Sequence, residues 1–146
     1  MNRKISVLFL ITLFISSINL ISCKKEEVCT ISTVDYVGNY TIDEDCSLSP
    51  AGSYSITIST NASDSTIVIE HFWKFFQHQV YASVDCDKIT IARQEPDSDG
   101  FFVEGSGNYS VSNGITTLTF NYTVYDETDP NLILPDICSN SVFIKQ

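Results

Sequence analysis

Side chains that could do acid–base or metal chemistry are scattered along this chain. His71 and His78 lie seven residues apart with no cysteine or carboxylate at ligand spacing, which predicts two surface histidines. Asp97 and Asp99 could be calcium ligands, but "EPDSDG" lacks the spacing of an EF-hand loop. The acidic run Asp43-Glu44-Asp45 is interpreted as a solvated turn. With no Ser-His-Asp order, nucleophile elbow or phosphate loop, the sequence predicts no enzyme, no metal and no cofactor.

Five cysteines are the remaining reactive groups. Cys23 ends an apolar leader, and the other four are spread over the rest of the chain without a CxxC arrangement, which disfavours zinc and thiol-redox chemistry. An even number of cysteines in an exported chain predicts two disulfides, for which three connectivities exist. These four are Cys29, Cys46, Cys86 and Cys138.

The N-terminal segment has the pattern of a secretory leader. Arg3 and Lys4 precede "ISVLFLITLFISSINLI", an apolar run without a charge. The run is also close to the length of a membrane-spanning helix. Leu20-Ile21-Ser22-Cys23 resembles the bacterial lipobox, which implies cleavage before Cys23 and a diacylglycerol on its sulfur. We therefore expect a signal peptide over 1–22 and a lipidated tether over 23–34. A plain leader and an uncleaved helix remain the alternatives.

The mature chain is strongly acidic, and a charged segment follows Cys23 directly. The leader holds two of the eight basic residues, so the mature chain carries six against eighteen acids, a net charge of −12. Nucleic-acid binding needs a basic footprint and is not expected.

Lys25-Glu26-Glu27 resembles the export tag of surface lipoproteins of the Bacteroidota. The resemblance implies an outer-membrane lipoprotein on the cell surface. The periplasmic face and a merely solvated tether remain alternatives.

Beyond residue 34, apolar and polar residues alternate at the period of a half-buried strand. Asn113-Gly114 between two such runs is the clearest hairpin signal. A longer turn is predicted over Glu127–Asp136, "ETDPNLILPD". Eight strands are predicted: Gly38–Ile42, Tyr54–Thr60, Thr66–His71, Val80–Asp85, Lys88–Arg93, Phe101–Val111, Ile115–Tyr125 and Ser139–Lys145.

One face of each predicted strand is apolar. Eight short antiparallel strands of this kind suit an up-and-down barrel or a two-sheet β-sandwich. Gly105 and Gly107 share the inward face and would let their strand coil, which favours the all-β, eight-stranded antiparallel barrel over 35–146. The predicted inward set is Tyr54, Ile56, Ile58, Ile67, Ile69, Val80, Ala82, Val84, Ile89, Ile91, Phe101, Val103, Tyr109, Val111, Leu118, Phe120, Tyr122 and Val124.

Strand direction constrains the disulfides. In an up-and-down barrel, the end of strand one and the start of strand eight lie at one rim, where Cys46 and Cys138 fall. The start of strand one and the turn between strands four and five lie at the opposite rim, where Cys29 and Cys86 fall. The simplest pairing is therefore Cys46–Cys138 and Cys29–Cys86.

Several segments resemble those of small lipocalin-like lipoproteins of the Bacteroidota. They are "GNYTIDEDC", "YSITIST" and "GSGNYSVSNGITTLTFNYTVYD", followed by a late cysteine. The resemblance covers Val37 to Lys145, and Gly38-Asn39-Tyr40 is similar to the opening of the first lipocalin strand. It implies a lipocalin-like barrel that carries a ligand, without naming the ligand.

The aromatic run "HFWKFFQHQV" lies where turn residues would be expected. One interpretation is a ligand-binding lip at the barrel mouth, formed by Phe72, Trp73, Phe75 and Phe76. The other is a plug that caps the core, which the dominance of aromatic residues in small cores favours.

The sequence is thus consistent with two functions. The first is a non-catalytic envelope lipoprotein that binds a small apolar or glycan ligand at the barrel mouth, with the membrane as its partner through the lipid. The second is a surface interaction or inhibitor module with a filled core and loop-borne contacts. About twenty inward apolar side chains favour a filled core, since an eight-stranded barrel has room for side chains or one small ligand.

Overall fold

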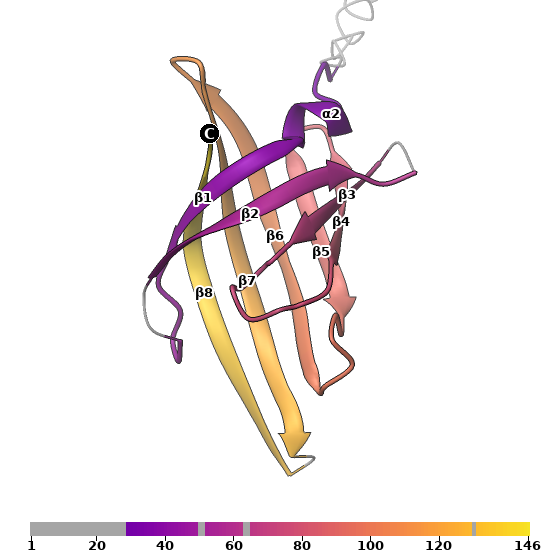
Figure 1. The fold of residues 1–146 in the computed structure, drawn as a ribbon, viewed down its shortest axis with the longest axis vertical. Helices are drawn as coiled ribbons and strands as arrows, with labels where there is room; N and C mark the ends of the chain where they lie inside the picture. The colour runs from indigo at the N-terminus through magenta and orange to yellow at the C-terminus, as the bar shows by residue number, and fades with distance from the viewer. Residues whose placement is uncertain (1–28, 50–51, 63–64, 130) are drawn as a thin grey trace, which may run out of the picture.

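A computed structural model describes residues 29–49, 52–62, 65–129 and 131–146. Eight antiparallel strands follow one another around a closed barrel (Figure 1). A single short helix, α2 (Thr33–Tyr36), precedes them in the described part of the chain. The strands are β1 (Gly38–Glu44), β2 (Gly52–Thr60), β3 (Thr66–Glu70), β4 (Val80–Asp85), β5 (Lys88–Gln94), β6 (Phe101–Ser112), β7 (Ile115–Asp129) and β8 (Leu132–Lys145).

Each strand pairs with the next one in sequence, and β1 also pairs with β8. The closing contact runs from Tyr40 opposite Lys145 to Asp43 opposite Val142. A two-sheet sandwich has no such pairing between first and last strands. The predicted up-and-down barrel, lipocalin-like in its architecture, is therefore confirmed, and the sandwich alternative is wrong.

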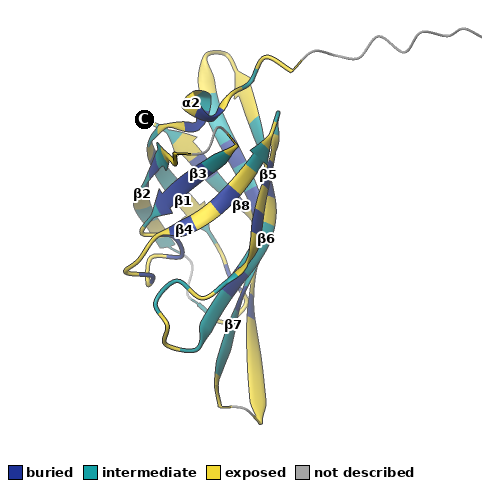
Figure 2. Cartoon of the chain, turned by 90° about the vertical axis from the view of Figure 1, so that its right-hand side faces the viewer, coloured by how far each residue is buried: buried dark blue, intermediate teal, exposed yellow. Residues whose placement is uncertain are grey.

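The barrel interior is filled by the predicted apolar faces. From Asp136 onward, buried residues recur along β8 between more exposed ones (Figure 2), as they must when one face of a strand meets the core. Val111 departs from the prediction, because its side chain is 55% exposed. β5 pairs with β6 only as far as Asn108, so the end of the β6–β7 hairpin projects beyond its neighbours. The largest fully buried side chains are Tyr36, Tyr40, Phe72, Phe120 and Phe143.

Gly105 and Gly107 let β6 and β7 approach closely. A Cβ on Gly105 would lie 2.5 Å from the Cβ of Tyr122, and one on Gly107 would lie 2.7 Å from Cδ1 of Phe120. Both distances are far inside van der Waals contact. The inward glycines therefore make room for the large rings of β7, and a side chain at either position would force the strands apart.

The turn predicted over Glu127–Asp136 is wrong. β7 continues to Asp129 and β8 already begins at Leu132, so most of that segment is a long hairpin. The prediction failed because Pro135 suggested a loop. β1 covers the other edge of β8 only from Val142 onward, so no strand needs the missing N–H of Pro135.

One end of the barrel, here called the closed rim, is covered by α2 and the turn between β4 and β5. Tyr36 is fully buried, and its hydroxyl donates to the carbonyl oxygen of Cys86 at 2.5 Å. Tyr40 in turn donates to the carbonyl oxygen of Tyr36 at 2.8 Å. The predicted disulfide Cys29–Cys86 joins the chain before α2 to this rim. No sequence pattern indicated α2, which begins within the segment interpreted as tether.

Candidate functional site

The opposite end, here called the aromatic rim, carries the segment 71–79 between β3 and β4, the loop 95–100, and the β7–β8 hairpin (Figure 1). The backbone of segment 71–79 is unusual. His71, Trp73 and Lys74 have φ angles of 62°, 53° and 59°, in the left-handed region. This conformation costs each such residue about 1–2 kcal/mol. The surrounding contacts must supply that energy, and such strain is typical of functional sites.

Phe72 is directed into the barrel. It is fully buried, and its ring centroid lies 4.7 Å from that of Tyr122 and 6.1 Å from those of Phe120 and Phe143. This side chain closes the core, as the plug interpretation expects. Trp73 and Phe76, later in the same segment, are also buried, and Phe75 alone of these rings is exposed.

Trp73, Phe75, Phe76 and Phe101 form an aromatic cluster at this rim. The centroid of Trp73 lies 5.0, 5.3 and 6.0 Å from those of Phe75, Phe76 and Phe101. Phe75 is 54% exposed and Trp73 only 9%. The cluster lines a groove of about 310 Å³, here called the aromatic groove, together with Ser49, Asp97 and Asp99.

A second, smaller groove of about 160 Å³ shares Ser49, Trp73 and Phe101 with the aromatic groove. The two grooves therefore adjoin along the same pair of rings. The other residues that line the second groove are Leu48, Val124, Asp126, Leu134 and Asp136.

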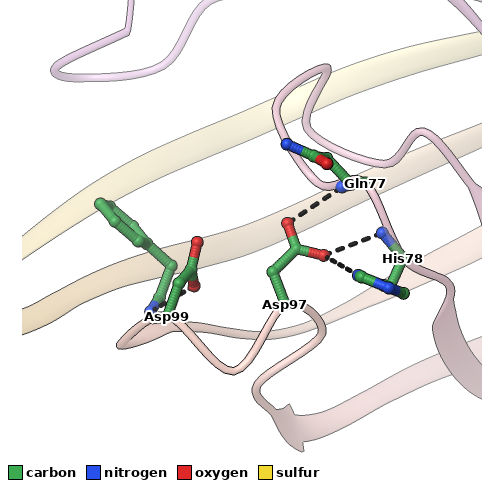
Figure 3. Close-up of polar contacts among 5 residues, drawn as sticks. Gln77, His78, Asp97 and Asp99 are labelled. Atoms are coloured by element: carbon green, nitrogen blue, oxygen red, sulfur yellow. Dashed lines mark hydrogen bonds and ion pairs between the residues drawn. The ribbon is translucent and has the colours of Figure 1, made fainter.

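Asp97 holds the aromatic segment against loop 95–100 (Figure 3). Its carboxylate accepts hydrogen bonds from the backbone N–H groups of Gln77 at 2.9 Å and His78 at 2.8 Å. Nδ1 of His78 lies 2.9 Å from the same carboxylate. Burial opposes ionisation, but these donors outweigh it and hold the pKa of Asp97 below its usual value. Asp97, for which a calcium site was considered and not favoured, is thus a clamp between two loops.

Asp136 is a second clamp, which holds segment 47–49 beside the smaller groove. It is buried, and its carboxylate accepts the backbone N–H of Leu48 at 2.7 Å and that of Ser49 at 3.2 Å. The hydroxyls of Ser47 and Ser49 also donate to it. Although burial works against ionisation, these hydrogen bonds lower the pKa of Asp136. No local sequence pattern had singled out Asp136. The disulfide Cys46–Cys138, predicted and present, brings 47–49 beside it and was the available signal.

The interpretation of Asp43-Glu44-Asp45 as a solvated turn is wrong for Glu44, which lies in β1. β1 extends two residues further than predicted, so Glu44 is the next inward residue after Ile42. The hydroxyl of Tyr122 donates to its Oε2 at 2.6 Å. Burial raises the pKa of Glu44, partly offset by the hydrogen bond from Tyr122. A polar cluster therefore lies inside the barrel near the aromatic rim.

Metal-binding potential in the described ranges is limited to one group, Glu44, Cys46 and Cys138. Its two sulfurs are bonded to each other, so Glu44 alone could ligate an ion there. His71 and His78 do not form such a group with a carboxylate. Both histidines are exposed, as expected.

Cys23, the predicted lipidation residue, lies outside the described residues, as do 1–28 generally. Within the described ranges, no helix is both long and apolar enough to span a bilayer. No known protein family matches the chain, and neither a curated protein nor a solved structure matches it significantly.

Proposed function

We propose that this protein is a non-catalytic lipoprotein of the bacterial outer membrane that holds a small ligand in the aromatic groove. The observation that supports this best is the groove itself. Four rings meet at the barrel mouth on a strained backbone that Asp97 clamps in place. Concave apolar sites with a few fixed polar groups are the usual form of small-molecule sites.

The filled interior makes the proposed site shallow. Phe72, Phe120 and Phe143 occupy the barrel centre with their ring centroids 4.7–6.1 Å apart. A ligand would therefore rest on the mouth, with part of its surface in water, rather than enter the barrel. This geometry suits a receptor-like binding protein better than a carrier that encloses its cargo.

The proposed anchor would orient the groove outward. Cys29 is bonded to Cys86 at the closed rim, and Cys23 precedes Cys29 by only six residues. Six extended residues span at most about 22 Å. A lipid on Cys23 would hold the closed rim near the bilayer and leave the aromatic rim facing away from it, toward the external medium for a cell-surface protein.

Native mass spectrometry of the full chain, after gentle extraction from its own cells, tests this function. The expected result is a mass that includes acylation at Cys23 and a retained small molecule. Replacing the exposed ring by Phe75→Leu should reduce retention, whereas the matched change Phe102→Leu on the outer face should not. A protein without acyl chains and without retained ligand, in a correctly folded state, would contradict the proposal.

A second candidate is a surface interaction module. Exposed aliphatic side chains gather on the β7–β8 hairpin, where Leu132 and Ile133 are each 54% exposed and Leu134 is 42% exposed. The filled core and this projecting hairpin favour contacts with another macromolecule. The test compares the growth phenotype of host cells that carry each variant. If Leu132→Ser with Ile133→Ser reproduced the phenotype of a deletion while Phe75→Leu had no effect, this candidate would replace the first.

A further inference from the structure

The two adjoining grooves have one electrostatic character. Asp97 and Asp99 line the aromatic groove, and Asp126 and Asp136 line its neighbour. No lysine, arginine or histidine is among the described residues that line either one. The rings shared by both grooves, Trp73 and Phe101, are therefore accompanied by carboxylates in each direction and by no basic side chain.

We infer that the aromatic groove binds an organic cation, an alkylated ammonium group placed against its ring faces and carboxylates. The inference rests on the proposed function and specifies its ligand class. The face of an aromatic ring carries negative electrostatic potential and attracts such a cation within about 6 Å of its centroid. The exposed ring of Phe75 and the exposed carboxylate of Asp99 offer both contacts in one groove.

The negative charges at the grooves are held in place by the fold. Asp126 accepts the backbone N–H of Thr128 at 3.1 Å and its hydroxyl at 2.6 Å. These bonds lower the pKa of Asp126, and the donors described above do the same for Asp97 and Asp136. These three carboxylates thus stay ionised at neutral pH, and in the described part of the chain His78, beside Asp97, is the one basic side chain that contacts any of them. The whole chain, with a net charge of −10, adds a long-range attraction for cations.

An organic cation fits this site better than a metal ion. Calcium requires six to eight oxygen ligands at 2.3–2.6 Å. Within the described ranges, none of the groove aspartates belongs to a group of metal-type ligands, and much of the groove surface is aromatic. A methylated ammonium group has a low charge density and an apolar shell, so it can lie against rings while the carboxylates balance its charge.

The single tryptophan of the chain makes the test direct, because Trp73 lines both grooves. Choline is titrated into the purified full-length protein while tryptophan emission is recorded. The neutral isostere 3,3-dimethylbutan-1-ol provides the comparison. We expect a saturable change with choline and at least about tenfold weaker binding of the isostere.

Two variants locate the cation. Asp99→Asn removes one charge, yet its amide oxygen can still accept the N–H of Phe101, which lies 3.2 Å from Oδ1 of Asp99. We expect about fivefold weaker choline binding. Asp87→Asn removes the same charge at the turn between β4 and β5, on the closed rim, and should change affinity by less than about twofold because water and salt screen distant charges.

Four outcomes would overturn the inference. Equal binding of choline and its isostere would show an apolar site and leave the proposed function intact. Equal weakening by Asp99→Asn and Asp87→Asn would show that net charge, not the groove, attracts the cation. No response to choline, while native mass spectrometry still finds a retained neutral molecule, would assign the groove to another ligand class. Absence of every ligand in both experiments would contradict the proposed function as well.

Discussion

Single residues decide whether this barrel can close around its rings. At Gly105, a methyl group would meet the Cβ of Tyr122 at 2.5 Å and the carbonyl oxygen of Asn121 at 2.6 Å. Backbone atoms cannot rotate away as a long side chain can. The constraint is steric, because Gly105 does not have a left-handed φ.

Gly105→Ala is therefore expected to lower the free energy of unfolding by about 1–3 kcal/mol, the usual cost of overpacking. Urea unfolding followed by circular dichroism measures it. Ser106→Ala, on the exposed face of the same strand, is the matched control and should change stability by less than about 0.5 kcal/mol. If both variants unfolded at the same urea concentration, close approach of β6 and β7 would not be the reason for the glycine.

Glu44 gives the fold a pH dependence of defined sign. Its pKa is raised in the folded state because burial penalises the carboxylate. The protonated form therefore stabilises the fold at pH values below the unfolded pKa of about 4.3, and this contribution is lost as the pH rises through the folded pKa. Glu44→Gln keeps an acceptor for the hydroxyl of Tyr122 but cannot ionise.

We accordingly expect the wild-type protein to lose stability relative to Glu44→Gln as the pH is raised from about 4 to 8. Urea unfolding at several pH values measures the difference between the two proteins. Asp43→Asn, on the neighbouring outward position, is the control. A difference that grew toward acid pH instead would show that the ionised carboxylate is the form the fold prefers.

At the scale of elements, alternation and turn chemistry predicted most of the barrel. Asn113 and Gly114 have φ angles of 52° and 79°, as the hairpin signal required. The β7–β8 hairpin was missed because Pro135 is a loop signal unless one knows that β1 leaves that edge of β8 uncovered. Helix α2 has four residues, too few for a helical period to be visible in sequence.

The candidate site was only partly predictable, because it depends on backbone turns and long-range contacts that leave no local sequence pattern. The aromatic run drew attention by composition, but which ring enters the core depends on the left-handed turns around Trp73, and no glycine marks them. The clamp carboxylates, Asp97 and Asp136, act on segments 19 to 89 residues away in sequence. Local patterns cannot reveal such contacts.

The disulfide Cys29–Cys86 ties the first described segment to the closed rim, across 57 residues. Removing it by Cys29→Ser with Cys86→Ser should lower the free energy of unfolding by about 4 kcal/mol in the chain-entropy account. Calorimetry under non-reducing conditions measures this loss. Because the aromatic groove lies at the other rim, the same variant should bind choline as the parent does in its folded state. Loss of binding in a folded variant would show that the two rims are coupled.

For the whole molecule, the proposed arrangement is an acidic barrel whose closed rim faces the bilayer. The acidic net charge gives no attraction to an anionic membrane surface. The proposed lipid on Cys23 would supply the attachment, since two or more acyl chains hold a protein firmly where one does not. Cys23→Ala should therefore move from the envelope fraction to the soluble or uncleaved precursor fraction. Its four remaining cysteines should still form both disulfides if export continues. If the variant fractionated with membranes as tightly as the parent, with its leader still attached, the anchor would be residues 5–21 and not the lipid. The distance from the bilayer to the closed rim would then be set by a longer tether, and the outward orientation of the groove would no longer follow.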